Sequence, residues 1–432
     1  MNSTVYVLVA GLNQTVRNWE GVSPPLIDNC FQIAFRMRKF SDDFYLSKLD
    51  DVFSYIEKYW KRSRQSLASE PFNIEECFTL IELQRREASV TGRSQDEDSL
   101  YQVQFKLKSF LAELLSDFAV FSNSSPEMHR LGQILWNEKP TILTFNYDTI
   151  LESIIELASG HSEDFTPHLL GEFFRKEVDG SGDAPDELLS SSFNRWKRPL
   201  GYGILFNEVK LPHVGPAIIQ DGKRYYDLPS NKLYTWPILK LHGSINWFRY
   251  LPIRSMPTFP GEDEPIFSDE ISKRTLLIEG SWWFTEPPRH NGWYLDPVMI
   301  TPDLNKEEKL HHPVFTAIWD RARNSLSECK RLIIIGYAFS TADFPTKKLF
   351  LEAFVQNTLD ELIVVNPDTS VVKTVKDLCH FQKPVVVCKD IAEFLRMYDQ
   401  PGNIGIDELI RLMRFRESPD KGTQEGQLPP TP

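Results

Sequence analysis

The chain has 432 residues, of which 41% are apolar, 12% aromatic and 25% charged. This composition can bury a large core, and it excludes a small disulfide-stapled domain and a disordered chain. Sixty acidic and 48 basic side chains leave a net charge of −12, which repels phosphate backbones, so no nucleic-acid binding is expected. The apolar stretches are shorter than the ~18 residues of a membrane span, and no basic residue precedes the apolar run at 5–10. We therefore expect a cytoplasmic protein with no signal peptide and no membrane attachment.

The cysteines are odd in number and include no C-x-x-C pair; they are Cys30, Cys77, Cys329, Cys379 and Cys388. Structural zinc sites usually use closely spaced cysteine pairs. We interpret these residues as reduced thiols that pack in the core, and we expect no metal.

The first third of the chain predicts a strand followed by helices. Residues 4–11, TVYVLVAG, are a β-branched apolar run that ends in glycine, as in a buried parallel strand that leads into a loop. From 46 to 118, apolar residues recur with helical spacing and predict about three helices, with a polar loop at 91–99. Asn73 and Glu76 resemble a capping box at a helix start. This helical insertion is placed at 40–120.

Short buried strands return further along the chain, at 141–145, 237–241, 298–300, 331–335, 361–365 and 384–388. Helical patterns follow or precede them at 148–157 and 315–326. This alternation predicts an α/β fold, a Rossmann-like doubly wound parallel sheet that occupies residues 1–400. Residues 160–235 are expected to be a second, irregular insertion. A terminal helix is expected at 401–416 and a disordered tail at 417–432.

Polar or glycine clusters directly after strands are candidates for a site, because ligands of open α/β sheets bind outside the carboxyl ends of the strands. The clusters are Ala10–Asn13, Thr144–Asp148, Leu241–Ser244, Gly336–Ser340 and Asn366–Asp368. Taken singly, each also suits a structural turn.

In this order the clusters resemble the zinc-free sirtuin-like (Sir2-like) NAD hydrolases of bacterial antiphage defence. The matching motifs are a glycine-containing first loop, Thr-x-Asn-x-Asp at 144–148, Leu-His-Gly-Ser at 241–244, Gly-Tyr at 336–337 and Asn-Pro at 366–367. The resemblance spans about residues 5–394 and implies a sirtuin-like core with NAD as substrate. Val9 stands where the family has glycine. Its side chain either crowds the pyrophosphate or lies in the strand while Gly11 alone permits close approach.

Cleavage of the nicotinamide–ribose bond passes through an oxocarbenium-like state, so the site must orient a ribose and a water. Asn146 offers a neutral amide with donors and an acceptor. His242, a residue type with an ordinary pKa of ~6.5, suits proton acceptance, although a single histidine after a strand is often structural. Asp148 either orients Asn146, faces the developing cation, or only answers the dipole of the helix that follows it.

The resemblance and the strand context assign further residues to NAD binding, namely Ala10, Gly11, Asn13, Thr144, Gly336, Ser340, Asn366 and Asp368. Gly11 and Asn13 would lie near the pyrophosphate, and Gly336 leaves room for the dinucleotide. The hydroxyls of Thr144 and Ser340 would donate to phosphate or ribose. Asn366 and Asp368 either hold the adenine-side ribose or form an ordinary Asn-Pro-Asp turn.

The function that the resemblance implies is NAD+ hydrolysis to nicotinamide and ADP-ribose, by an effector that depletes NAD in an infected cell. It also implies a homo-oligomer, or a separately encoded activator or ATPase partner, with the helical insertion as the candidate contact surface. Two alternatives remain. One is a non-catalytic NAD or ADP-ribose sensor; the other, disfavoured because the paired zinc-binding cysteines of deacylases are missing, is an NAD-dependent deacylase or ADP-ribosyltransferase.

Overall fold

The structure is a computed structural model. It describes residues 4–18, 20–37, 40, 46–119, 125–158, 173–179, 200–201, 223–229, 236–250, 276–277, 289–290, 293–301, 310, 313–339, 343–356 and 359–399. Most of the predicted irregular insertion at 160–235 lies outside these ranges. The terminal helix predicted at 401–416 and the tail predicted at 417–432 lie entirely outside them.

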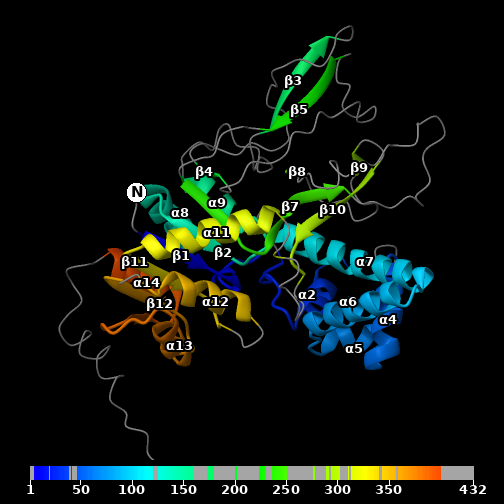
Figure 1. Cartoon of the computed structure of the whole chain (residues 1–432), viewed down its shortest axis with the longest axis horizontal. Helices are drawn as coiled ribbons and strands as arrows, with labels where there is room; N and C mark the ends of the chain where they lie inside the picture. Colours follow the sequence, from blue (N-terminus) through cyan, green and yellow to red (C-terminus); the bar gives the residue numbers. More distant parts are fainter. Residues whose placement is uncertain are drawn as a thin grey trace, which may run out of the picture.

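A seven-stranded sheet forms the core, with the strand order β13-β12-β11-β1-β2-β6-β4, and each strand is parallel to its neighbours (Figure 1). The strands are β1 (Thr4–Leu8), β2 (Thr141–Thr144), β4 (Leu200–Gly201), β6 (Trp236–Lys240), β11 (Arg331–Ile335), β12 (Glu361–Val365) and β13 (Val386–Cys388). All five residues of β1, TVYVL, are buried. Such continuous apolar runs are typical of strands with both faces covered. The predicted doubly wound α/β fold is confirmed.

Helices that follow the strands cover the sheet. Among them α8 packs on α9 and α14, and α11 packs on α12, which also contacts α13. Right-handed crossovers to opposite sides of β1 place these two groups on opposite faces of the sheet. Their bounds are α8 (Pro126–Glu138), α9 (Ile150–Ala158), α11 (Pro313–Glu328), α12 (Phe344–Ala353), α13 (Ser370–Leu378) and α14 (Ile391–Asp399).

The predicted helical insertion between β1 and β2 is confirmed. Within the predicted bounds 40–120 the structure describes four helices where about three were predicted, α4 (Asp50–Trp60), α5 (Arg64–Ser69), α6 (Ile74–Val90) and α7 (Ser94–Ala119). The helix α2 (Cys30–Arg36) precedes these bounds. Asn73 caps α6, since its Oδ1 accepts the backbone N–H groups of Glu75 and Glu76 at 2.9 and 3.3 Å. The loop predicted at 91–99 is wrong in length, because α7 begins at Ser94. The polar residues there include Asp96 and Glu97, whose negative charges interact favourably with the helix dipole in the exposed first turn of α7.

A second sheet is antiparallel and has the order β8-β7-β10-β9. Its strands are β7 (Gly243–Tyr250), β8 (Leu276–Leu277), β9 (Arg289–His290) and β10 (Trp293–Met299), and β3 (Phe173–Asp179) pairs separately with β5 (Lys223–Pro229). The strand predicted at 298–300 is the end of β10 and does not join the parallel sheet. A short apolar run indicates a strand without indicating its sheet. Figure 1 shows β7 and β10 between the parallel sheet and the helical insertion, and α7 contacts both strands.

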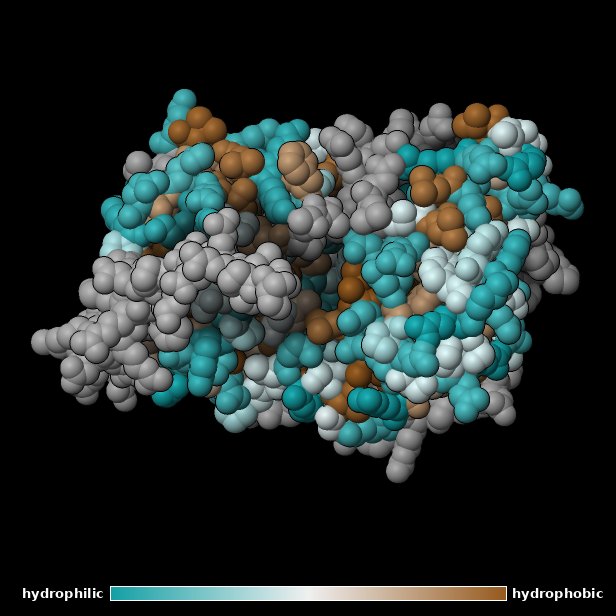
Figure 2. Space-filling view, turned by 90° about the horizontal axis from the view of Figure 1, so that it is seen from below, coloured by the Kyte–Doolittle hydropathy of each residue, from teal (hydrophilic) through white to brown (hydrophobic). Residues whose placement is uncertain are grey.

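The outer surface is mainly hydrophilic on the face shown in Figure 2, where hydrophobic groups are scattered among polar ones. No helix in the described part of the chain is long and apolar enough to cross a membrane. All five cysteines are buried and free. Burial raises the pKa of Cys30 and Cys77 to about 12, so these thiols stay protonated and pack as apolar groups.

Candidate functional site

The carboxyl ends of five neighbouring parallel strands lie side by side. Leu8 of β1 is in register with Thr144 of β2 and with Ile335 of β11. Thr144 is in register with Lys240 of β6, and Ile335 with Val365 of β12. The segments that follow these strands therefore emerge at one edge of the sheet. In the sheet, β2 and β6 lie on one side of β1, whereas β11 and β12 lie on its other side. The strand order therefore reverses at β1, and ligands of open α/β sheets bind at such a switch point.

The loops after β1 and β11 touch through their backbones. The N–H of Gly11 donates to the carbonyl of Gly336 at 3.2 Å. A Cβ at Gly11 would lie 2.7 Å from that oxygen, and a Cβ at Gly336, whose φ is +72°, would lie 2.4 Å from the nitrogen of Leu12. Both positions therefore require glycine. Val9 is buried and its N–H donates to Ile335 at 3.1 Å, so it continues the strand, while Gly11 is exposed.

The segment after β1 is not an open loop, because Ala10–Asn13 forms the short helix α1. Within it Ala10 is half-buried and Asn13 is buried. The Nδ2 of Asn13 donates to Oδ2 of Asp148 at 2.7 Å, which joins the segments after β1 and β2. The other carboxylate oxygen of Asp148 accepts the N–H of Ile150, the first residue of α9, at 3.1 Å. Asp148 thus accepts a hydrogen bond at the start of the following helix, in line with the structural alternative for it, and it also holds Asn13.

The Asp148 carboxylate titrates unusually. Burial raises its pKa to about 6, although Lys240 acts in the opposite direction. In an unfolded chain an aspartate titrates near pH 3.9, so between these values the folded state binds more protons than the unfolded state. The contribution of Asp148 to stability is therefore full below about pH 4 and is lost as the pH rises through 6.

We predict that the wild type loses about 2 kcal/mol of unfolding free energy relative to Asp148→Asn between pH 4 and pH 7, measured by urea denaturation. Asp368→Asn is the matched control. Hydrogen bonds from Ser370 lower the pKa of the exposed Asp368, so its contribution is present above its unfolded pKa and its pH slope has the opposite sign. A flat difference between wild type and Asp148→Asn would contradict the raised pKa.

Asn146 follows β2 and is half-buried. Its backbone N–H donates to Oγ1 of the buried Thr144 at 3.1 Å, so the Thr144 hydroxyl serves this turn. The amide side chain of Asn146 makes no hydrogen bond to any residue that the structure describes. Its donors and its acceptor are therefore available to a ligand at the strand edge.

His242 follows β6 and is packed by the two neighbours of Asn146. Its ring lies 5.0 Å from the Phe145 ring, edge to face, and 6.1 Å from the Tyr147 ring, nearly parallel. The Tyr147 hydroxyl donates to the carbonyl of Ile300 at 2.6 Å, and the Ile300 N–H donates to the carbonyl of His242 at 2.9 Å. His242 is 7% exposed. The fold thus brings Asn146 and His242 to adjoining strand ends, and the aromatic rings fix the imidazole.

The segment after β12 is tied into the fold. The buried Asn366 donates from Nδ2 to the carbonyl of Tyr337 at 2.8 Å and accepts the N–H of Asp368 at 2.9 Å. Asp368 in turn accepts the N–H of Ser370 at 2.9 Å. These bonds form the ordinary Asn-Pro-Asp turn that was the alternative for this segment. Tyr337 stacks on Phe145 at 5.0 Å, which links this turn to the end of β2. Ser340 lies outside the described residues.

Two charged residues behind this edge were not predicted. Lys240 and Glu152 are both 0% exposed, and Nζ of Lys240 lies 2.9 Å from Oε1 of Glu152. Nζ also donates to the backbone carbonyl of Asp148. The sequence carries a signal only for the lysine, because Lys240 ends an otherwise apolar strand at 236–240, whereas Glu152 is one of several polar residues of the helix at 150–158. Through Lys240 the pair contacts the backbone of Asp148, and Lys240 precedes His242 by two residues in the sequence.

No protein-family model and no curated protein matches the chain. Among solved structures, the chain is similar to one described as the crystal structure of a Sir2 homolog–NAD complex. The two share 11% sequence identity and a TM-score of 0.38, over 96% of this chain and 90% of that one. A similarity of this size carries no function across, so the proposal below depends on the residues at the strand edge.

Proposed function

We propose that this protein hydrolyses NAD+ to nicotinamide and ADP-ribose, and that it depletes cellular NAD as an antiviral defence effector. One observation carries the activity: Asn146, whose amide has no partner among the described residues, lies between Phe145 and Tyr147, which both pack on His242 where two parallel strands end next to a switch point. The sequence resemblance to zinc-free sirtuin-like NAD hydrolases supplies the substrate and the defence role.

The reaction consumes water and breaks the bond between C1′ of the ribose and the nicotinamide nitrogen. The bonding pair leaves with nicotinamide, and the water oxygen bonds to C1′ and releases one proton. Asn146 orients the ribose hydroxyl or the attacking water without adding charge. His242 accepts the proton, and the rings of Phe145 and Tyr147 hold its imidazole in place. Asp148 acts as a positioning residue because both its oxygens already accept hydrogen bonds within the fold.

The dinucleotide would approach the exposed backbone of Gly11, where α1 meets Gly336. Absence of side chains at both positions lets the two loops close on each other and leaves Gly11 open at the edge. Asn13 is held by Asp148, so it would contribute through its position in α1. Asn366 and Asp368 would bind the adenine-side ribose only after leaving the hydrogen bonds of their turn.

The test is release of nicotinamide from NAD+ by the purified full chain, followed by chromatography, with ADP-ribose formed in equal amount. Cellular NAD is also measured after induction of the protein, with and without the neighbouring genes. This second measurement detects an enzyme that is active only with an activator. NAD binding without turnover under both conditions would instead support the sensor. Consumption of an acylated or acceptor peptide in step with nicotinamide release would support a deacylase or ADP-ribosyltransferase.

Regulation by a homo-oligomer, or by a separately encoded activator or ATPase, belongs to the same proposal. The helical insertion carries a polar hollow of about 760 Å³ between α4, α6 and α7, lined among others by Lys58, Tyr59, Glu87 and Arg93. Its mixed charges suit a polar protein contact. Light scattering of the purified chain, alone and with the products of the neighbouring genes, measures the assembly.

A further inference from the structure

A cavity of about 430 Å³ lies between the helical insertion and the antiparallel sheet. None of the described residues that line it belongs to the strand-edge site. Its walls come from α6, α7, β7, β10 and α11, and include Arg85, Tyr101, Lys108, Arg249, Asp296 and Phe315. Protein interiors leave few voids larger than a water molecule, and this volume is in the range of sites for small organic ligands.

On the helical wall, the carboxylate of Glu82 pairs with Arg85, which lines the cavity, and with Arg86, which does not. Glu82 accepts from Arg85 at 3.5 Å and from Arg86 at 3.2 Å. Nη1 of Arg85 donates to Oε1 of Gln104 at 2.6 Å, and its guanidinium lies 4.7 Å over the Tyr101 ring. The Nε of Arg85 is buried and has no hydrogen-bond partner among the described residues. A buried donor that is left unpaired destabilises the fold, and the same side chain lines the cavity.

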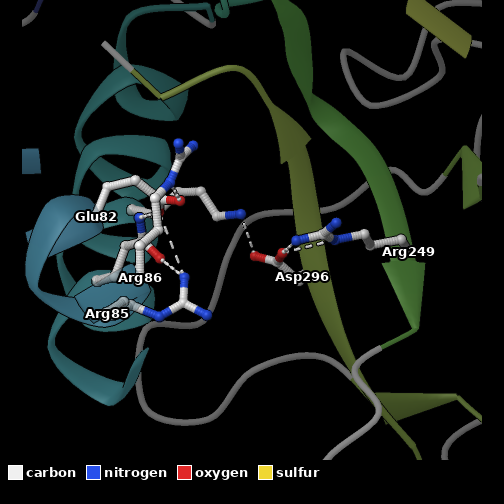
Figure 3. A network of polar contacts seen from close by, with 7 residues as sticks. Glu82, Arg85, Arg86, Arg249 and Asp296 are labelled. Carbon is white, nitrogen blue, oxygen red and sulfur yellow. Dashed lines mark hydrogen bonds and ion pairs between the residues drawn. The ribbon is translucent and has the colours of Figure 1, made fainter. Parts of the chain in front are cut away.

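The strand wall repeats the arrangement. Asp296 pairs with Lys108, and it accepts from Nε of Arg249 at 2.9 Å (Figure 3). Burial alone would raise the pKa of Asp296, but Lys108 and Arg249 outweigh it and lower that pKa, so the carboxylate stays ionised. Lys108 also donates to the carbonyl of Pro297 at 2.9 Å. The single negative charge of Asp296 therefore holds two positive charges, those of Lys108 and Arg249, at the cavity.

Among the described residues that line the cavity, the three cationic side chains of Arg85, Lys108 and Arg249 face two carboxylates, those of Glu82 and Asp296. This local positive excess occurs in a chain whose net charge is −12. Figure 3 shows the helical residues Arg85 and Arg86 opposite Asp296 and Arg249 on the strands. Apolar side chains, among them Phe105, Val298 and Phe315, complete the lining.

We propose that this cavity binds a small organic anion, with a phosphate or carboxylate head that pairs with the guanidinium of Arg85 and a body that packs on the apolar wall. A planar guanidinium suits such heads because it presents two parallel donors. Arg249, on the opposite wall and 43% exposed at its side chain, supplies the second positive charge.

The test uses isothermal titration of the purified full chain with phenyl phosphate, benzoate and inorganic phosphate. We expect one organic anion to bind per chain. The stronger of the first two identifies the head group, and weaker binding of inorganic phosphate shows that the apolar wall contributes. Arg85→Ala should weaken binding at least about tenfold. Arg85→Lys should bind with intermediate affinity because it keeps the charge and loses the paired donors.

Arg323→Ala is the matched control, since the side chain of Arg323 is 39% exposed and pairs with Asp320 and Glu352 outside this cavity. Its affinity should equal that of the wild type. Circular dichroism confirms folding, and Arg85→Lys alone decides the matter if Arg85→Ala does not fold. Absence of binding by all three probes would show that the network only joins the insertion to the sheet, and equal binding by wild type and both Arg85 variants would also overturn the proposal. These measurements do not require NAD turnover.

Discussion

Replacing Asn146 by alanine is expected to lower nicotinamide release from NAD+ by at least about 100-fold while the protein stays folded. Positioned polar groups that act in the transition state are worth about 10²- to 10⁴-fold, and 100-fold corresponds to about 2.7 kcal/mol of activation free energy. The stability should change by less than about 0.5 kcal/mol, because the amide has no partner among the described residues and is half-buried. Initial rates and urea denaturation of the same preparations measure both quantities.

Two further variants define what the amide contributes. Asn324→Ala removes an exposed asparagine side chain on α11 and should leave both the rate and the stability unchanged. Asn146→Asp keeps the size of the side chain but adds a negative charge and removes the donors, so it should be nearly as inactive as the alanine variant. Unchanged turnover by Asn146→Ala would remove the residue from the mechanism and would direct attention to the sensor alternative.

Much of the sheet could be predicted because buried parallel strands have sequences that are short continuous apolar runs. The runs predicted at 331–335 and 361–365 coincide with β11 and β12. The common edge of the site followed from the rule that parallel strands end on one side, and the register of Leu8, Thr144 and Ile335 agrees with it. Sequence order together with strand polarity therefore located Asn146 and His242 near each other.

The uses of the individual side chains could not be predicted from the same patterns. Asn366 and Asp368 serve a turn, and the Thr144 hydroxyl serves the backbone of Asn146, because local hydrogen bonds compete with a ligand for the same atoms. Gly11 and Gly336 are required by contact between two loops, which depends on the tertiary fold. The sequence of β10 indicates a strand but does not indicate its sheet. That assignment depends on its pairing with β7, which no local pattern specifies.

The buried pair behind the site gives the largest expected effect on stability. Lys240→Met keeps the length of the side chain but leaves the fully buried Glu152 without its ammonium partner. Removing one member of a buried ion pair costs about 3–5 kcal/mol, which is a large share of the roughly 5–15 kcal/mol that stabilises a folded protein. Urea denaturation should show this loss. The control Lys348→Met, at an exposed lysine 3.9 Å from Glu352, should change stability by less than about 0.5 kcal/mol.

The double variant Lys240→Met/Glu152→Leu separates the pair from the packing of its members. Replacing both charges by apolar groups is often neutral, so part of the lost stability should return. About 1–3 kcal/mol should remain lost, because the carbonyl of Asp148 also loses the lysine donor. If the effects of the two single variants add, the pair contributes no coupling and the lysine stabilises the fold only through that carbonyl. Strong coupling would instead show that the ion pair itself stabilises this part of the fold. The pair would then hold Asp148 at the strand edge, and Asp148 in turn holds Asn13.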